Sequence, residues 1–296
     1  MPGTADGHAA AARLAGSSAG RSRAGAGDDR LTGRATAYSV AVAVTDEERF
    51  QFDLQGFLIV KGVLSGAELR VLNAAVDERF DEYAKPSEHW RPHRCSNWGQ
   101  PFVDLIDHDR LMPYLPELVG PYFRADHDYC IFMRRGDARG GLHGGSHLRY
   151  SWSDHWYRYQ DGLMRNGLTV FTYFLTDAAE GDGGFACVPG SHKSNFLDKL
   201  PSDVRDFERE APYVLQPAVE AGDVLIFTEA LVHGTMPWTA DHERRCLLFK
   251  YSPGHSAWDR DGYDPADYRS LRLTERQRRI MQPPYVGGHQ PILDSA

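Results

Sequence analysis

The sequence is poor in cysteine and has no long apolar run. Its cysteines stand far apart and form no C-x-x-C pair, at Cys95, Cys130, Cys187 and Cys246. This spacing argues against a zinc knuckle or a dithiol redox site and fits a reducing cytoplasm, which is the location we expect. No stretch of about 18 apolar residues occurs, so we expect no segment that spans a membrane.

A basic excess is also missing. Lys and Arg together number 33 against 41 Asp and Glu, which gives a formal net charge of −8. A nucleic-acid-binding protein with a broad basic face is not expected from this balance. A small anionic substrate needs only a local cluster of cations, so the net charge leaves that class of ligand open.

Apolar material for one sizeable core is present, because 42% of the 296 residues are hydrophobic and 11% are aromatic. Residues 1–40 are the exception, since they consist mainly of Ala, Gly, Ser and Arg. Such a segment cannot bury enough apolar surface to offset the conformational entropy lost on folding. We therefore predict a disordered extension over residues 1–40 and one folded domain over residues 41–296.

Two helices with a short strand between them are expected at the start of this domain. Thr45 with Glu48 fits a capping box, and Ser65 with Glu68 fits a second one. Residues 56–63 lie between the two boxes and have the composition of a strand. Apolar side chains then recur at helical spacing, at Leu72, Val76, Phe80 and Tyr83.

Beyond residue 125 the pattern changes to short β-rich runs separated by Gly, Pro and Asp. The runs are "DYCIFMRRG", "GLTVFTYFLTD", "GFACVPG", "YVLQP", "DVLIFT" and "RRCLLFKYS". No helices of crossover length alternate with them, which argues against a parallel α/β sheet. The pattern favours a sandwich, jelly roll or barrel, followed by a helix over 274–281.

Two of the 13 histidines stand next to predicted strands, in loops where a rigid scaffold aims side chains at one point. His143 lies in "GGLHGGSH", and His233 begins "HGTMPW". Two imidazoles on one metal leave positions open for substrate and oxygen, as in the two-His-one-carboxylate sites of non-haem iron. The spacing alone is a weak signal, because a lone histidine is more often an ordinary surface or core residue.

From about Phe52 to Pro284 the chain resembles the phytanoyl-CoA dioxygenase family of Fe(II)/2-oxoglutarate oxygenases. The stretches that carry the resemblance are "DLQGFLIVKGVLSGAEL", "GDGGFACVPGSHK", "AGDVLIF" and "VHGTMPW", followed by an arginine. Their order along the chain is more specific than any one of them. The resemblance implies a mainly β fold with flanking helices and a double-stranded β-helix core of the jelly-roll or cupin-like type.

The same resemblance implies the site residues and the cofactors. His143 matches the first iron ligand and His233 the last, and the cofactors are Fe(II), 2-oxoglutarate and O2. The arginine that pairs with the distal carboxylate of 2-oxoglutarate matches Arg244, since a planar guanidinium holds a carboxylate through two parallel hydrogen bonds. The adjacent Arg245 would point to the other side of the strand.

The family's usual H-x-D motif lacks its carboxylate here, because the sequence has Gly145 two residues after His143. Loss of the carboxylate opens a coordination position and removes one negative charge, and chloride would restore both. This H-x-G motif resembles the iron- and 2-oxoglutarate-dependent halogenases. It implies that Gly145 admits chloride and that the protein chlorinates an unactivated carbon of a small molecule in natural-product biosynthesis.

Three alternatives stay open at this point. The first is a hydroxylase with a rearranged metal triad, in which Glu229 or Asp154 supplies the missing carboxylate. The second is a non-catalytic relative that kept the fold and lost the iron, against which the retained histidines and arginine argue. The third is an unrelated metal site of His143 and His147, which needs a helix that the intervening glycines disfavour.

The stretch 146–167 is too long and too aromatic for a simple connection, and we interpret it as a lid over the metal. Its aromatic rings would stack on a flat substrate and its arginines would meet an anion, although the rings are equally suited to packing the lid onto the barrel. A purine nucleotide fits such a lid, and the chain resembles the actinomycete enzymes that chlorinate deoxyadenylate. The residues concerned are Arg149, Trp152, Trp156, Tyr157, Arg158 and Tyr159.

Overall fold

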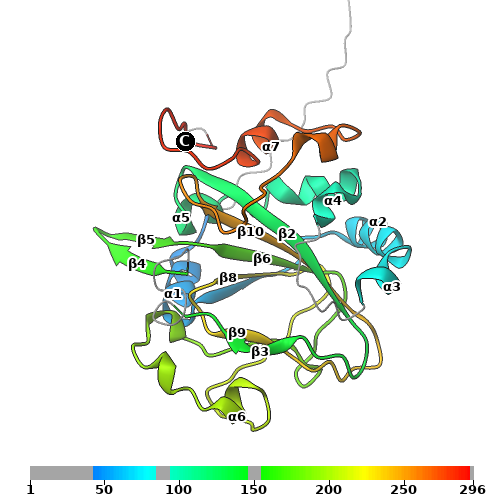
Figure 1. The fold of residues 1–296 in the computed structure, drawn as a ribbon, viewed down its shortest axis with the longest axis vertical. Helices are drawn as coiled ribbons and strands as arrows, with labels where there is room; N and C mark the ends of the chain where they lie inside the picture. Colours follow the sequence, from blue (N-terminus) through cyan, green and yellow to red (C-terminus); the bar gives the residue numbers. More distant parts are fainter. Residues whose placement is uncertain (1–42, 85–93, 146–154, 294–296) are drawn as a thin grey trace, which may run out of the picture. The chain divides into compact units, whose positions relative to one another are not determined.

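The computed structural model describes residues 43–84, 94–145 and 155–293 (Figure 1). The predicted extension over residues 1–40 lies outside these ranges and stays a prediction, as does the first part of the predicted lid. The described chain is rich in β-strands with helices at its flanks, which confirms the fold class at this level. No helix in the described ranges is long and apolar enough to cross a membrane.

A five-stranded antiparallel sheet forms the larger half of the β structure, with strand order β1-β8-β6-β10-β2. Its strands are β1 (Phe57–Val60), β8 (Val224–Thr228), β6 (Thr169–Phe174), β10 (Arg244–Pro253) and β2 (Phe123–Met133). The order places the predicted first strand of the domain at one edge. The long strands β10 and β2 pair along their whole lengths, with one irregularity between Lys250 and Tyr251.

A three-stranded antiparallel sheet lies across from the large one (Figure 1). It consists of β3 (Gly140–His143), β9 (His233–Met236) and β7 (Gly184–Cys187). A separate hairpin is formed by β4 (Tyr157–Gln160) and β5 (Leu163–Asn166). Of these strands only β7 was expected from the sequence.

Both faces of the large sheet are covered, and the side chains alternate between two cores. Phe171 and Tyr173 of β6 belong to the core that packs against the helices. Val170 and Phe174 of the same strand belong to the core that includes Phe185 of the small sheet. Phe171 and Tyr173 therefore share one face of the sheet, and the cavity described below opens beside the second core.

The helices lie mainly on the outer side of the large sheet, and α6 lies near the small sheet (Figure 1). They are α1 (Asp46–Gln55), α2 (Gly66–Asp77), α3 (Phe80–Tyr83), α4 (Gln100–Val103), α5 (Tyr114–Leu118), α6 (Ser202–Arg205) and α7 (Glu275–Ile280). Both predicted capping boxes are present, at the starts of α1 and α2. Thr274 and Gln277 cap α7 in the same way.

Two predictions about secondary structure are wrong in detail. The run "YVLQP" forms no named strand, and only Leu215 makes an isolated bridge, to Cys187. The helical periodicity from Leu72 to Tyr83 is divided, because α2 ends at Asp77 and α3 begins at Phe80. The backbone turns between them, which brings Tyr83 to the wall of the cavity.

Candidate functional site

His143 and His233 meet because they are direct partners in the small sheet. His143 ends β3, His233 begins β9, and the two residues face each other in the antiparallel register. Their ring centroids lie 4.5 Å apart. The expectation that both lie in loops is therefore wrong, since a strand pair rather than two loops sets their separation. This pairing explains how two histidines far apart in sequence come together.

The orientation of the two rings suits metal binding. Nδ1 of His143 lies 2.9 Å from the carbonyl oxygen of Gly141, and Nδ1 of His233 lies 2.8 Å from that of Leu231. A neutral imidazole that donates from Nδ1 to a carbonyl keeps the lone pair of Nε2 available for a metal. Burial lowers the pKa of His233 to about 3, and the nearby Glu229 opposes this effect only partly. His233 is thus neutral at neutral pH, as a ligand must be.

A cavity of about 670 Å³ opens in front of these histidines. Its wall combines apolar side chains with a small number of polar ones, which is typical of a small-molecule site. The polar and charged side chains among its lining residues include His143, His155, Glu229, His233, Arg244 and Lys250. The structure therefore gathers three of the four predicted site residues, His143, His233 and Arg244, around one cavity.

Arg244 is a buried cation without a carboxylate partner among the described residues. Its side chain is 2% exposed, its Nε has no hydrogen-bond partner, and its Nη1 lies 3.7 Å from Sδ of Met133. Gly184 leaves room for it, since a Cβ there would lie 2.8 Å from Nε of Arg244. A buried guanidinium needs an anionic partner. The distal carboxylate of 2-oxoglutarate would fit this requirement.

The neighbouring Arg245 lies on the other side of β10, as expected from the alternation of a strand. It forms ion pairs with Glu243 at 2.6 Å and with Asp77 at 2.7 Å. Arg245 is absent from the cavity lining in the described part of the chain. The two adjacent arginines therefore have different environments: Arg245 is paired with carboxylates, and Arg244 has no carboxylate partner among the described residues.

Gly145 has a backbone conformation that side chains rarely adopt. Its φ is 91°, and Gly144 before it has a φ of 95°. A Cβ on Gly144 would lie 2.5 Å from the carbonyl oxygen of Leu231, so this segment packs directly on the backbone before His233. An aspartate at position 145 would be strained in this conformation. The local backbone is thus adapted to glycine and not merely missing a carboxylate.

Glu229, named above as an alternative carboxylate, lies next to the histidines. Its Oε2 is 3.7 Å from Nε2 of both His233 and His155, and its Oε1 is 2.5 Å from Nζ of Lys250. Burial alone would raise the pKa of Glu229, but Lys250 and the two neighbouring histidines together outweigh this effect and hold the pKa well below its usual range. Asp154 and His147, the other candidates, lie outside the described residues.

Within the described ranges, no group of three or more His, Cys, Asp or Glu side chains is arranged to hold a metal ion. The arrangement around His143 and His233 therefore offers two candidate ligands, with Glu229 held beside them by Lys250. The chemistry of this donor set fits Fe(II), which binds imidazole and accepts its remaining ligands from cofactor and solvent.

His155 and Lys250 were not predicted as site residues. Lys250 could have been found from the sequence, because it lies six positions after Arg244 on the same strand, and an even offset places both side chains on one face. His155 lies in the segment interpreted as a lid, and its ring stacks on Trp258 with centroids 4.7 Å apart. The contact between His155 and Trp258 could not be predicted from the sequence, since Trp258 lies in the loop that follows β10, far along the chain from His155.

The described part of the predicted lid contributes only His155 to the cavity wall. Trp156, Tyr157, Arg158 and Tyr159 are absent from the lining. Tyr157 instead donates a hydrogen bond to Asp53 and packs on His192, which fixes the hairpin to α1. Packing against the domain, the alternative role, is thus what the structure shows for Tyr157, whereas Tyr159 is largely exposed. Arg149 and Trp152 lie outside the described residues.

Two of three comparisons with known proteins give a match. Residues 142–246 match the family model of phytanoyl-CoA dioxygenase, a stretch that contains both histidines and Arg244. A search of curated proteins gives no match. HygX from Streptomyces hygroscopicus, in a crystal structure with nickel and 2-oxoglutarate bound, is 26% identical with a TM-score of 0.63. The match covers 74% of this chain and 90% of HygX.

More distant structures show the fold alone. AviO1 from Streptomyces viridochromogenes is 20% identical with a TM-score of 0.52, over 70% of this chain and 93% of AviO1. SnoK, a non-heme alpha-ketoglutarate-dependent carbocyclase, is 17% identical with a TM-score of 0.55, over 73% of this chain and 87% of SnoK. The chain is thus similar to phytanoyl-CoA dioxygenases over residues 142–246 and shares its overall fold with HygX, AviO1 and SnoK.

Proposed function

We propose that the protein is an Fe(II)- and 2-oxoglutarate-dependent enzyme with a double-stranded β-helix core that oxidises a small molecule in natural-product biosynthesis. One observation carries the proposal. His143 and His233 present Nε2 to the same cavity in which Arg244 is buried without a carboxylate partner among the described residues. The similarity to HygX, whose crystal structure contains nickel and 2-oxoglutarate, supports the same assignment.

Each group of residues in the cavity has a separate role in this proposal. His143 and His233 would hold the iron, and Arg244 would hold the distal carboxylate of 2-oxoglutarate through its guanidinium. When bound, iron with 2-oxoglutarate and O2 supplies the oxidising power for attack on a C–H bond. The apolar wall of the cavity, which includes Phe132, Phe185 and Phe227, keeps water away from the reacting carbon.

Chlorination is the reaction that we propose. Gly145 provides no carboxylate, its φ of 91° disfavours one, and no three-ligand group is present in the described chain. Chloride would take the position left open. In this reaction the substrate C–H, chloride, a proton, O2 and 2-oxoglutarate give a C–Cl bond, succinate, CO2 and water, so atoms and charge balance.

Hydroxylation is the second candidate, and the position of Glu229 favours it. Its Oε2 lies 3.7 Å from Nε2 of His233, so a modest shift of this carboxylate would bring it to a shared metal. Against this candidate, Oε1 of Glu229 is bound to Lys250 at 2.5 Å. The two candidates differ in whether an external anion enters the coordination of the iron.

The substrate is a small molecule that fits the cavity of about 670 Å³. HygX has been crystallised with hygromycin B bound, and that structure is 25% identical to this chain with a TM-score of 0.63, over 73% of this chain and 90% of HygX. A natural product of the antibiotic class is therefore a reasonable first group to test. A purine nucleotide such as deoxyadenylate is the specific substrate that the composition of the predicted lid and the resemblance to deoxyadenylate-chlorinating enzymes led us to expect.

The test is anaerobic reconstitution with Fe(II) and 2-oxoglutarate, followed by recording the visible charge-transfer band with and without chloride. We expect a band that shifts when chloride is added. A band that ignores chloride would favour hydroxylation, and no band at all would overturn both candidates.

A matched pair of variants tests the role of Arg244 in the same assay. Arg244→Gln should raise the KM for 2-oxoglutarate about 100-fold, because one charge-assisted double hydrogen bond is lost. Arg245→Gln changes the adjacent arginine, which is already paired with Glu243 and Asp77, and should leave this KM unchanged. Equal KM values in the two variants would argue against Arg244 as the carboxylate partner.

A further inference from the structure

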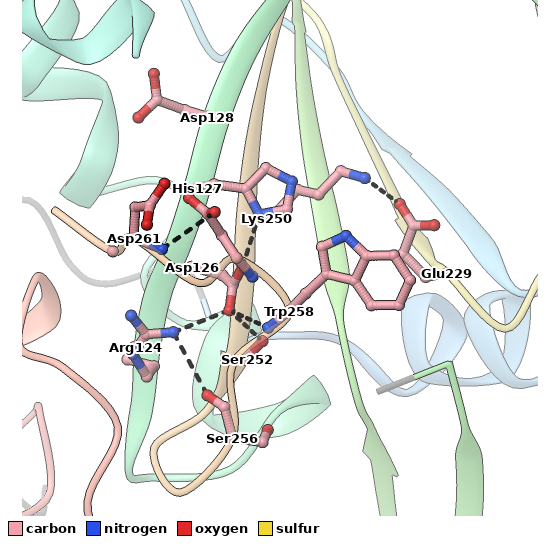
Figure 2. A network of polar contacts seen from close by, with 12 residues as sticks. Arg124, Asp126, His127, Asp128, Glu229, Lys250, Ser252, Ser256, Trp258 and Asp261 are labelled. Carbon is pink, nitrogen blue, oxygen red and sulfur yellow. Dashed lines mark hydrogen bonds and ion pairs between the residues drawn. The ribbon is translucent and has the colours of Figure 1, made fainter. Parts of the chain in front are cut away.

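The ion pair between Glu229 and Lys250 is the strongest charged feature of the cavity that the proposed reaction leaves without a role. Glu229 follows the end of β8, and Lys250 points toward it from β10 (Figure 2). Both side chains are buried, with 4% and 7% exposure, and their charged atoms lie 2.5 Å apart. Burying such a pair is costly, and replacing it by apolar side chains is often neutral for stability, so stability alone does not explain it.

The two oxygens of Glu229 have different surroundings. Oε1 accepts the hydrogen bond from Lys250, whereas Oε2 faces Nε2 of His233 and of His155, each at 3.7 Å. Both Nδ1 atoms of the predicted iron ligands are bound to backbone carbonyls, so it is the metal-binding side of His233 that Glu229 approaches. Glu229 is thus the acidic side chain that contacts a predicted ligand within the described cavity wall.

Backbone packing also brings Glu229 close to the segment that contains Gly144 and Gly145. Gly144 packs against the carbonyl oxygen of Glu229 itself, since a Cβ at position 144 would lie 2.9 Å from that atom. The segment that lacks the family's carboxylate and the segment that carries Glu229 are therefore in direct contact. A bound divalent metal would attract this carboxylate, and the positive charge of Lys250 is what competes for it.

We propose that Lys250 holds Glu229 out of the coordination of the metal and thereby keeps one ligand position available to an external anion. The inference rests on the proposed function and extends it. Gly145 removes one carboxylate from the site, and Lys250 prevents a second carboxylate from replacing it. Lys250 is in this sense a positioning residue, which acts on the metal site through Glu229. Chloride then enters a site from which both protein carboxylates are excluded.

The test measures metal binding, independently of turnover. Ni(II) or Co(II) is titrated into the metal-free protein by calorimetry, with 2-oxoglutarate, in chloride and in a chloride-free buffer. For the wild type we expect tighter metal binding when chloride is present. Lys250→Met frees Glu229, so this variant should bind the metal about ten-fold more tightly without chloride and lose the chloride response.

Glu229→Gln and the double variant Glu229→Gln/Lys250→Met keep the test decisive if Lys250→Met alone fails to fold. Both should retain the metal affinity and the chloride response of the wild type, because neither contains a carboxylate that can move. Lys193→Met is the matched control, since Lys193 pairs with Asp53 away from the cavity lining. Circular dichroism in the near ultraviolet checks the fold of each variant.

Two results would overturn the inference while leaving the proposed function intact. One is a chloride response that survives in folded Lys250→Met. The other is a loss of metal affinity of about ten-fold or more in Glu229→Gln, which would mean that Glu229 is already a ligand in the wild type. A wild-type protein that binds metal but does not convert 2-oxoglutarate to succinate would instead contradict the proposed function.

Discussion

Two buried carboxylates lie near the β2–β10 strand pair, Asp126 on β2 itself and Glu229 against Lys250 of β10, and they are used differently (Figure 2). Asp126 accepts hydrogen bonds from the side chains of Arg124, His127 and Ser252. It also accepts from the backbone N–H groups of Trp258 and Asp259, which lie in the loop after β10. Glu229, by contrast, has one short bond to Lys250, and its second oxygen faces two histidines. His127 and Lys250 are direct register partners, so the two clusters are adjacent.

The difference separates a structural carboxylate from a functional one. Every oxygen of Asp126 is occupied by donors that connect β2, β10 and the Trp258 loop, so this carboxylate has no capacity left for a ligand. Glu229 keeps an oxygen directed at the cavity, where a metal would add a second positive charge. Full satisfaction indicates a structural role, and a partly satisfied carboxylate in a cavity indicates a functional one.

The largest effect is expected from loss of a histidine that Glu229 faces. His233→Ala removes a predicted metal ligand beside Glu229 and should lower the rate of 2-oxoglutarate turnover by about 1000-fold or more. His255→Ala, an exposed histidine, is the control and should have no effect. The measurement is succinate formation at saturating iron. A His233→Ala enzyme that keeps most of its activity would remove His233 from the site.

The second effect concerns stability. Asp126→Asn places an amide N–H₂ against groups that already donate, and it leaves Arg124 buried without its partner at 2.9 Å. We expect the free energy of unfolding to fall by about 3 kcal/mol, because breaking a buried ion pair is costly. Urea denaturation measures it. Metal affinity of the folded variant should stay unchanged. A loss of metal affinity without a loss of stability would mean that Asp126 also acts on the metal site.

The third effect is the pH dependence of the contribution that Asp126 makes to the free energy of unfolding. Burial alone would raise the pKa of Asp126, but the hydrogen bond from His127 and the other donors outweigh it and lower the pKa to about 2. A carboxylate with a lowered pKa stabilises the fold above its unfolded value near 4, and this contribution disappears as the pH falls from about 4 to about 2. Between about pH 5 and about pH 1 the stability difference between wild type and Asp126→Asn should shrink by about 2.5 kcal/mol in total. A constant difference would assign the stabilisation to contacts other than the charge.

The sequence was sufficient for elements whose signal is local. Capping boxes at Thr45 and Ser65 and the alternation in β6 depend on neighbouring residues, and the structure agrees with them. The short strands β3 and β9 were missed because neither GGLH nor HGTM has the composition of a strand, and each gains its hydrogen bonds from a distant partner. Their pairing is nevertheless what brings His143 and His233 together.

The candidate site was predictable where a motif or a strand period reached it. Arg244 was assigned through the family resemblance, and the opposite direction of Arg245 followed from the period of two in β10. The same period extends to Lys250. Glu229 could be named but not oriented, because its direction depends on the turn between β8 and β9. The His155–Trp258 stack depends on two segments that meet only in the folded chain, so no local pattern indicated it.

The smallest effect tests whether the Asp126 cluster is redundant. Ser252 donates to Oδ2 of Asp126 at 3.2 Å, the longest of the five bonds to this carboxylate. Ser252→Ala removes one donor and leaves four, so the free energy of unfolding should fall by only about 1 kcal/mol. Thermal unfolding of wild type, Ser252→Ala and Asp126→Asn in parallel gives the comparison. A loss in Ser252→Ala as large as that in Asp126→Asn would mean that the donors act as one unit. The Asp126 cluster would then be as dependent on a single contact as Glu229 is on Lys250.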